Sequence, residues 1–329
     1  MNEFFHLFIF LIILFLYIHI TSQYKRSEDL EIYEMDYATN THLQEVCDVK
    51  QPVLFNYKDI CPEFFDEMNI DLLSHHGKYD VKVKESADYF VENNETIDYI
   101  VLSMQSSLQL ITTDAKSAYF IENNEEFISD SGLFPLFQLN DELLKPAFTA
   151  QTKYDLLMGS KNSVMPLRYH TCYRKFLCVN SGKISIKMTP WKSHKYLYPI
   201  KDYDNYDFRS PINVWNPQPK YMQEMDKIKF LEFDVNKGHI LYIPPYWWYS
   251  IKFSTETTAV CDFTYNSVMN CVSNIPNYAL YFMQQQNTKS HSTKVLKQEV
   301  ENPDEIEETT PPSKTELEES IDIIRHNEN

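Results

Sequence analysis

The chain is poor in glycine and in positive charge, and each shortage excludes something. It has only 5 glycines among 329 residues. Glycine takes left-handed backbone conformations most readily, so we expect tight turns to rely on Asn and Asp instead. Lys and Arg number 30 against 47 Asp and Glu, which gives a formal net charge of -17. A groove that follows nucleic-acid phosphates needs a positively charged stripe, so we expect no nucleic-acid partner.

The cysteines include no C-x-x-C pair, which argues against a structural zinc site. Their even number permits disulfides, but a chain of this size does not need them to hold its core. We therefore expect reduced, buried thiols. The six positions are Cys47, Cys61, Cys172, Cys178, Cys261 and Cys271.

What the sequence does have is a long apolar run at its N-terminus, from Phe4 to Ile20, interrupted only by His6 and His19. At about 1.5 Å per residue, a helix of this length reaches about 25 Å, enough to cross a thin bilayer. A cleaved signal peptide is the alternative. However, no basic residue precedes the run, no small-x-small site follows it, and the run exceeds the usual ~7–15 residues. We predict a transmembrane anchor over residues 1–23.

The side of the membrane on which the rest of the chain lies stays open. Lys25 and Arg26 follow the apolar run, and the positive-inside rule then favours the cytosolic side. The sequon Asn94-Glu95-Thr96 points the other way, because such sites are glycosylated in secreted proteins. We predict a single-pass membrane protein, with the cytosolic side favoured.

The opposite end of the chain has the composition of a disordered tail. From Leu296 to Asn329, eleven acidic residues stand against three basic ones, with three prolines and no aromatic residue. Such a segment buries too little apolar surface to offset the conformational entropy lost on ordering. We predict an acidic disordered tail over residues 286–329.

Between these ends we predict one domain over residues 40–285. Short apolar runs separated by proline-containing corners dominate its second half, which is typical of a β-barrel or sandwich. Residues 98–112 mix apolar and polar side chains without a clean period, and either helix or strand fits them. The predicted strands of the second half are Tyr154–Met158, Phe176–Val179, Ile184–Met188, Phe230–Phe233, His239–Ile243 and Thr258–Phe263.

Residues 238–251 read Gly-His-Ile-Leu-Tyr-Ile-Pro-Pro-Tyr-Trp-Trp-Tyr-Ser-Ile, a strand that turns at two prolines and resumes on two tryptophans. They resemble the closing motif of the JmjC and cupin-like oxygenases, G-D-x-L-Y-I-P-x-x-W-W-H-x-I, whose final histidine binds iron. Tyr249 stands at that position. We interpret the preceding Tyr246, Trp247 and Trp248 as packing residues at the barrel rim.

A second block supports the same resemblance. Residues 154–170 are similar to L-W-I-G-x-x-G-S-x-T-P-L-H-Y-D, and residues 176–191 to F-L-x-Q-V-x-G-x-K-x-W-x-L-x-P, with Gly182 and Pro190 in place. Within the family, the chain looks most like the cupin-like asparaginyl hydroxylases that resemble the inhibitor of hypoxia-inducible factor. The resemblance implies a mainly β fold with flanking helices, a double-stranded β-helix or jelly-roll. It also implies Fe(II) and 2-oxoglutarate as the usual cofactors.

The resemblance also shows which functional residues are replaced. The family holds iron with two histidines and one carboxylate, and these positions map to Arg168, Tyr249 and His170 respectively. Arginine stays protonated and has no lone pair to donate, and a neutral phenol, with a pKa near ~10, is a poor ligand for iron. The co-substrate positions, Thr and Lys in the family, map to Met165 and Ile184. We therefore expect neither cofactor to bind.

Two charged side chains near these positions carry further predictions. Lys183 is adjacent to Ile184, but neighbouring residues on a strand face opposite sides, so its side chain should project out of the barrel. Arg168 needs a partner if it points inward, because an unpaired buried charge is costly. Asp262, on a predicted strand near the same open end of the barrel, is the predicted partner.

Three functions remain open. We favour a membrane-anchored pseudoenzyme, a non-catalytic module that binds an unidentified protein partner through its barrel and tail. The first alternative is an Fe(II)- and 2-oxoglutarate-dependent protein hydroxylase with a rearranged site, built on His170, Tyr249 and an unplaced carboxylate. The second alternative is a protein that binds a small anion in a cavity lined by Arg168 and Arg174.

Overall fold

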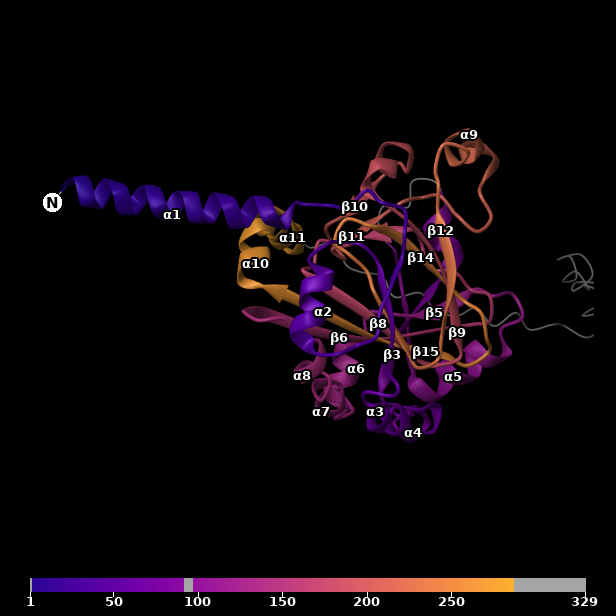
Figure 1. Ribbon diagram of the computed structural model, residues 1–329. Helices are drawn as coiled ribbons and strands as arrows, with labels where there is room; N and C mark the ends of the chain where they lie inside the picture. Colours follow the sequence, from indigo (N-terminus) through magenta and orange to yellow (C-terminus); the bar gives the residue numbers. More distant parts are fainter. Residues whose placement is uncertain (1, 92–96, 287–329) are drawn as a thin grey trace, which may run out of the picture. The chain divides into compact units, whose positions relative to one another are not determined.

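The computed structural model describes residues 2–91 and 97–286 (Figure 1). The predicted acidic tail lies outside these residues apart from its first position, and so does the sequon at residues 94–96. The N-terminal apolar run lies in α1 (Asn2–Gln23), where the side chains from Phe4 to His19 are exposed, Phe4 to 80%. Its segment Phe4–Gln23 is long and apolar enough to cross a membrane, and a signal sequence would have the same properties.

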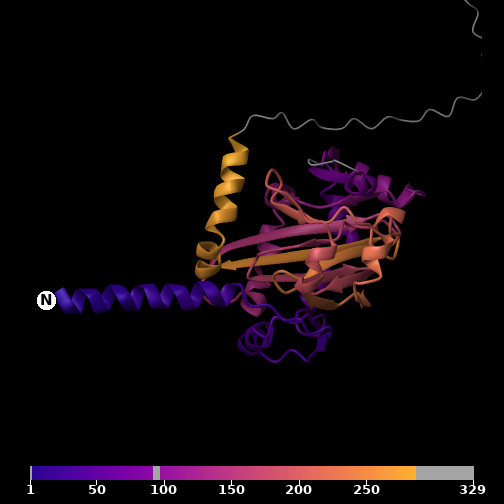
Figure 2. The ribbon, with the colours of Figure 1, turned by 90° about the horizontal axis from the view of Figure 1, so that it is seen from above.

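Two β-sheets face each other and form what we call the barrel (Figures 1 and 2). All of their strand pairings are antiparallel except that of β1 with β2. The nine-stranded sheet has the order β1 (Tyr33–Glu34), β2 (Val53–Asn56), β13 (His239–Tyr242), β8 (Arg174–Ser181), β15 (Thr258–Ser267), β6 (Thr149–Gly159), β5 (Tyr119–Ile121), β3 (Asp80–Glu85) and β4 (Ile100–Ser103). The six-stranded sheet has the order β10 (Ile200–Asp202), β11 (Asp207–Arg209), β7 (Arg168–Tyr169), β14 (Trp248–Phe253), β9 (Lys183–Thr189) and β12 (Leu231–Asn236).

The barrel core lies between the sheets, and a period of two places its residues there. On β9, Ile184 and Ile186 point inward, while Leu177 on β8 and Val260 on β15 approach them from the opposite sheet. Each such side chain is buried, which stabilises the fold by roughly 1.5–3 kcal/mol relative to exposure. The predicted mainly β fold with flanking helices is confirmed.

Helices cover the outer face of the nine-stranded sheet. Phe64 of α3 (Pro62–Glu67) and Phe137 of α7 (Phe134–Gln138) pack on Phe263 of β15, with ring centroids 5.9 and 5.7 Å from it. α2 (Asn40–Cys47) is bound to Arg174 of β8 through Gln44. The other helices are α4 (Ile70–His75), α5 (Met104–Thr113), α6 (Glu125–Asp130), α8 (Asp141–Leu144), α9 (Met222–Met225), α10 (Val268–Ser273) and α11 (Ile275–Gln285), with 3-10 turns at Ser86–Phe90, Trp191–Tyr196 and Pro219–Tyr221.

The predicted strands of the second half all coincide with strands of the barrel, with small shifts at their ends. The ambiguous stretch at residues 98–112 proves to hold one element of each kind, β4 followed by α5. Ser103 marks the switch, because its side chain caps α5 by accepting the backbone N–H of Ser106 at 3.2 Å.

We predicted that Asn and Asp occupy the left-handed turn positions, and for most of these positions the prediction is wrong. Among the described non-glycine residues with positive φ only Asn123 and Asn162 are of these types, and Tyr198, Tyr206 and Tyr246 share the conformation. At Tyr246, which is only 7% exposed, tertiary packing holds the strained conformation.

The six cysteines are free thiols, as expected. Only three of them, Cys47, Cys178 and Cys261, are buried, and the others are partly exposed.

Candidate functional site

A cavity of about 190 Å³ opens at one end of the barrel, and we call it the mouth cavity. The three residues that the sequence resemblance assigns to the family's iron-ligand positions all line this cavity. Arg168 of β7 and Tyr249 of β14 are direct cross-strand partners, and the ring of His170 lies 6.2 Å from that of Tyr249. Asp155, Lys175 and Asp262 line the cavity from the nine-stranded sheet.

Arg168 is clamped by a carboxylate that the sequence did not indicate. Its Nη1 and Nη2 donate to the two oxygens of Glu122 at 2.6 and 3.2 Å, and its Nε lies 3.6 Å from Asp207. The side chains of Arg168 and Glu122 are only 12% and 3% exposed. The prediction of Asp262 as the partner is therefore wrong. Glu122 follows β5, a three-residue strand too short to predict, and β5 places it beside Arg168 by pairing between β6 and β3.

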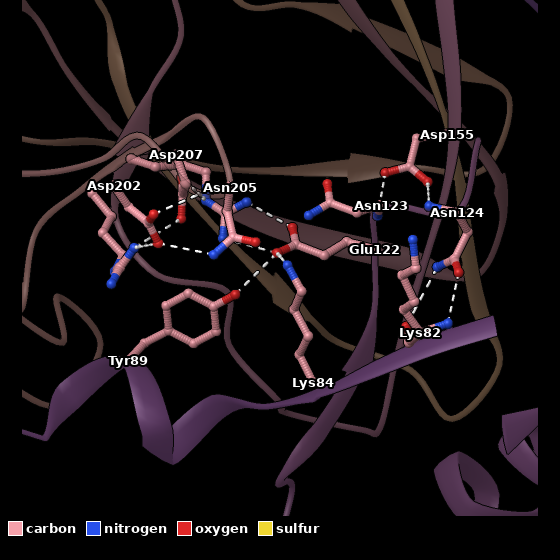
Figure 3. A network of polar contacts seen from close by, with 12 residues as sticks. Lys82, Lys84, Tyr89, Glu122, Asn123, Asn124, Asp155, Asp202, Asn205 and Asp207 are labelled. Carbon is pink, nitrogen blue, oxygen red and sulfur yellow. Dashed lines mark hydrogen bonds and ion pairs between the residues drawn. The ribbon is translucent and has the colours of Figure 1, made fainter. Parts of the chain in front are cut away.

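Glu122 is the centre of a buried polar network (Figure 3). Besides Arg168 it accepts hydrogen bonds from Lys84 Nζ at 2.8 Å and from the hydroxyl of Tyr89 at 3.1 Å. Burial alone would raise the pKa of Glu122, but Arg168 and Lys84 outweigh it and hold the pKa well below its usual range. The carboxylate is thus ionised and saturated with donors, which leaves it poorly suited to bind anything else.

The opposite wall of the mouth cavity holds a second ion pair. Lys175 donates to the carboxylate of Asp262 and lies 3.4 Å from the hydroxyl of Thr264. Beside them, Asp155 accepts the backbone N–H groups of Asn123 and Asn124, each at 2.7 Å (Figure 3). Burial and the nearby Asp262 raise the pKa of Asp155 to about 7.

His170 and Tyr249 are both neutral. Burial and the charge of Lys175 lower the pKa of His170 to about 3, and its Nε2 lies 3.0 Å from the carbonyl oxygen of Ile243. Burial raises the pKa of Tyr249 to about 12. A guanidinium, an imidazole and an un-ionised phenol do not fit Fe(II), which the family binds with two imidazoles and a carboxylate. Within residues 2–91 and 97–286, no group of three or more His, Cys, Asp or Glu is arranged to hold a metal ion.

The two residues that the resemblance assigns to the co-substrate site are apolar and lie in the barrel core. Met165 and Ile184 are 3% and 0% exposed. Lys183 points out of the barrel, as predicted, and pairs with Asp234 at 2.7 Å. A dicarboxylate would therefore meet no lysine at the place where the family offers one.

The cations that line the mouth cavity each have a carboxylate partner. Arg168 pairs with Glu122, Lys175 with Asp262, and Lys153 with Glu125 at 2.8 Å. The predicted lining residue Arg174 is not among them. It precedes Lys175 on β8 and so faces outward, where it is fully buried against α2 and pairs with Asp48 at 2.5 Å.

The residues assigned to the barrel rim are packed from both sides. Trp247 is 1% exposed and belongs to the core between the sheets, while Trp248 and Tyr246 pack in a second apolar cluster with Tyr169. Arg26, just after α1, stacks on this cluster, with its guanidinium carbon 4.3 Å from the ring centroid of Tyr246 and 4.1 Å from that of Trp191.

Lys84, Glu122 and Lys175 are the site residues that sequence reasoning missed. For Lys175 a signal exists, because it directly precedes the predicted strand Phe176–Val179 and alternates with the inward Leu177 and Val179. Glu122 has no such local signal, since only the non-local pairing of β5 brings it to the mouth cavity.

Comparison with known proteins matches the chain to one family and to a curated relative. The family model of the cupin-like domain matches residues 40–271. JmjC domain-containing protein D of Dictyostelium discoideum is 30% identical over 103 residues, which cover 31% of this chain and 23% of the relative. The match thus spans about a quarter of the relative's length.

Proposed function

The chain belongs to the cupin-like domain family, and we propose that it is a non-catalytic member, held at a membrane by α1, that binds a protein partner. The bidentate pair of Arg168 with Glu122 carries the proposal. It puts a permanent positive charge where the resemblance expects the first iron ligand. Iron could enter only if Arg168 left, and breaking a buried ion pair costs about 3–5 kcal/mol.

The hydroxylase alternative requires a carboxylate beside His170 and Tyr249. Of the carboxylates that line the mouth cavity, Asp262 is paired with Lys175, and Asp207 with Arg168 and Arg209. Glu125 is paired with Lys153, and Asp155 accepts two backbone N–H groups. The anion-binding alternative requires an unpaired cation in the mouth cavity, whereas the three cations that line it are paired. Both alternatives are therefore weaker than the binding module.

A metal titration tests the loss of catalysis. The full chain, in detergent micelles, is titrated with Mn(II) or anaerobic Fe(II) in the presence of 2-oxoglutarate, and heat is recorded by calorimetry. We expect no binding. The matched control combines Arg168→His, His170→Asp and Tyr249→His, which restores the family's donor set and should bind the metal in the same cell. Micromolar binding of metal and co-substrate by the unchanged chain contradicts the proposal.

The membrane role rests on α1 and on the segment that follows it. The hydroxyl of Tyr24 donates to the carbonyl oxygen of Ser273 at 2.6 Å, and Arg26 stacks on Trp191 and Tyr246. Residues directly after the helix are thus built into the domain, which favours an uncleaved anchor over a signal peptide. Lys25 and Arg26 favour the cytosolic side for the barrel. Chain that retains residues 1–23 and stays in the membrane fraction at alkaline pH supports the anchor, and cleaved, soluble chain contradicts it.

A further inference from the structure

α11 presents apolar side chains outward although it belongs to a folded domain. The helix carries no charged residue, and its side chains Ile275, Leu280, Phe282 and Met283 are 56%, 43%, 64% and 58% exposed. Ile275, Phe282 and Met283 are spaced i, i+7 and i+8, so they share one side of the helix. Contiguous exposed apolar surface on a folded protein marks a contact with a partner or a membrane.

The other side of α11 is fixed to the domain. The ring of Tyr278 stacks on that of Tyr206 at 5.4 Å, and Tyr281 meets the same ring edge-on at 5.7 Å. Gln285 Nε2 donates to the carbonyl oxygen of Asp204 at 2.8 Å. These contacts hold the helix in place, so its apolar side keeps a defined direction.

The exposed apolar side chains continue toward the end of α1. Tyr24 is hydrogen-bonded to Ser273, which lies two residues before α11, and α1 packs against α10. At the start of α10, Val268 and Phe148 are joined by a backbone hydrogen bond of 3.1 Å and are 48% and 88% exposed. We call Phe148, Val268, Ile275, Leu280, Phe282 and Met283 together the juxtamembrane face. Figure 2 shows α11 running across the direction of α1.

We propose that the juxtamembrane face lies in the lipid–water interface of the bilayer that α1 crosses, with α11 as an interfacial helix along its surface. The inference rests on the proposed membrane role of α1. Where α1 ends, the bilayer surface must lie, and the hydrogen bond of Tyr24 puts α10 and the start of α11 there. A helix with no charge binds through apolar area alone, so neutral lipid suffices.

This placement would also orient the mouth cavity. Tyr206 stacks on Tyr278 of α11. It also lines both the mouth cavity and a second, neighbouring pocket. A partner that reaches the mouth cavity would therefore approach along the membrane surface. The protein partner of the proposed function would then be membrane-bound or would contact the membrane.

Depth-dependent quenching tests the inference in the full chain. Phe282→Trp is reconstituted in phosphatidylcholine vesicles with brominated or ordinary acyl chains, and the emission of the unchanged chain is subtracted. Two matched variants accompany it: Phe10→Trp in α1, and Met222→Trp on α9, which is 51% exposed and lies on the far side of the domain (Figures 1 and 2). Unchanged thermal unfolding in detergent shows that each variant is folded.

We expect bromine to quench the added emission of Phe282→Trp at least twofold, to quench Phe10→Trp, and to leave Met222→Trp unchanged. Quenching of Phe10→Trp alone overturns the inference and leaves the membrane anchor standing. Quenching of neither overturns both. If Phe282→Trp is shielded from bromine and from aqueous iodide alike, a second copy or another protein covers the face, and the inference is wrong.

Discussion

Arg168 supplies a fixed cation among buried carboxylates. Glu122 and Asp207 are 3% and 17% exposed, and without a positive charge between them their negative charges would repel in a medium of low dielectric. The family resemblance places a divalent metal in this region, whereas here a guanidinium neutralises the carboxylates. The mouth cavity therefore needs no metal ion to be stable, which is consistent with the proposed loss of catalysis.

Replacing Glu122 by Gln tests the importance of this clamp. The change leaves Lys84 buried without its carboxylate and leaves Arg168 only the longer contact with Asp207 at 3.6 Å, so we expect the free energy of unfolding to fall by about 3–5 kcal/mol. The neighbouring Glu125→Gln is the matched control, because its pair with Lys153 is about half exposed and should contribute only about 0–1 kcal/mol. Denaturant unfolding measures both variants. Equal losses in the two would show that the clamp is no stronger than a surface pair.

The raised pKa of Asp155 leads us to predict that the stability of the folded chain depends on pH. Its pKa is raised to about 7 in the folded chain, whereas an unfolded aspartate titrates near ~3.9. Between these values the folded chain binds the proton more tightly, so the contribution of Asp155 to stability is present at low pH and is lost as pH rises through about 7. The free energy of unfolding of the unchanged chain, minus that of Asp155→Asn, should therefore fall by about 1–4 kcal/mol from pH 5 to pH 8.

Denaturant unfolding at several pH values measures this difference. Subtraction of the variant removes the opposing contribution of His170, whose lowered pKa makes stability rise with pH over part of the same range. Asp130→Asn, at the exposed end of α6, is the control for the loss of a carboxylate. A difference for Asp155→Asn that is flat or rises with pH contradicts the prediction.

At the scale of elements, two neighbouring residues of β8 serve opposite faces of the sheet. Lys175 faces the mouth cavity, and Arg174 faces α2 on the outside. Arg174 donates to the side chain of Gln44 at 2.8 Å and to its carbonyl oxygen at 3.2 Å, so one fully buried side chain fastens a helix to the sheet. The period of two makes this possible without any change of backbone direction.

Arg174→Met should release α2 without opening the barrel. The change keeps most of the side-chain length but removes the hydrogen bonds from Arg174 to Gln44 and the ion pair with Asp48, a loss of about 1–3 kcal/mol. Hydrogen exchange should speed up in α2 and remain unchanged in β9 and β14. Lys161→Met, which removes an exposed pair with Glu256 at 3.3 Å, is the control. Faster exchange throughout both sheets would mean that α2 and the barrel unfold as one unit.

How far the sequence predicts these elements depends on their length. β6, β8 and β9 are long enough for alternation to be visible, and the closing motif predicts β13 and β14. β5, β7 and β11 have two or three residues each, too few for a period, yet they carry or precede Glu122, Arg168 and Asp207. The resemblance thus singled out Arg168, His170 and Tyr249, which do share one cavity, but the ion pairs of Arg168 depend on strand pairings between distant segments.

At the scale of the whole molecule, the segment after α1 joins the proposed anchor to the barrel rim. The guanidinium of Arg26 lies between Trp191 and Tyr246, and Glu28 accepts the backbone N–H of Lys192 at 3.2 Å. The side chain of Lys192 donates as well, from Nζ to the carbonyl oxygen of Glu28 at 2.9 Å. Because the rim carries both this segment and the turn before β14, the direction of the anchor and that of the mouth cavity are coupled.

Arg26→Ala should weaken this coupling. Two cation–π contacts at a partly exposed site contribute about 1–2 kcal/mol together, so opening of the segment should become about tenfold more frequent. Cleavage after Glu28 by a glutamate-specific protease reports opening, and its rate should rise accordingly in the full chain in bilayers. Lys25→Ala removes the same charge from an exposed neighbour and should leave the rate unchanged. If both variants are cleaved at the rate of the unchanged chain, Arg26 does not hold the segment on the rim, and the prediction is wrong.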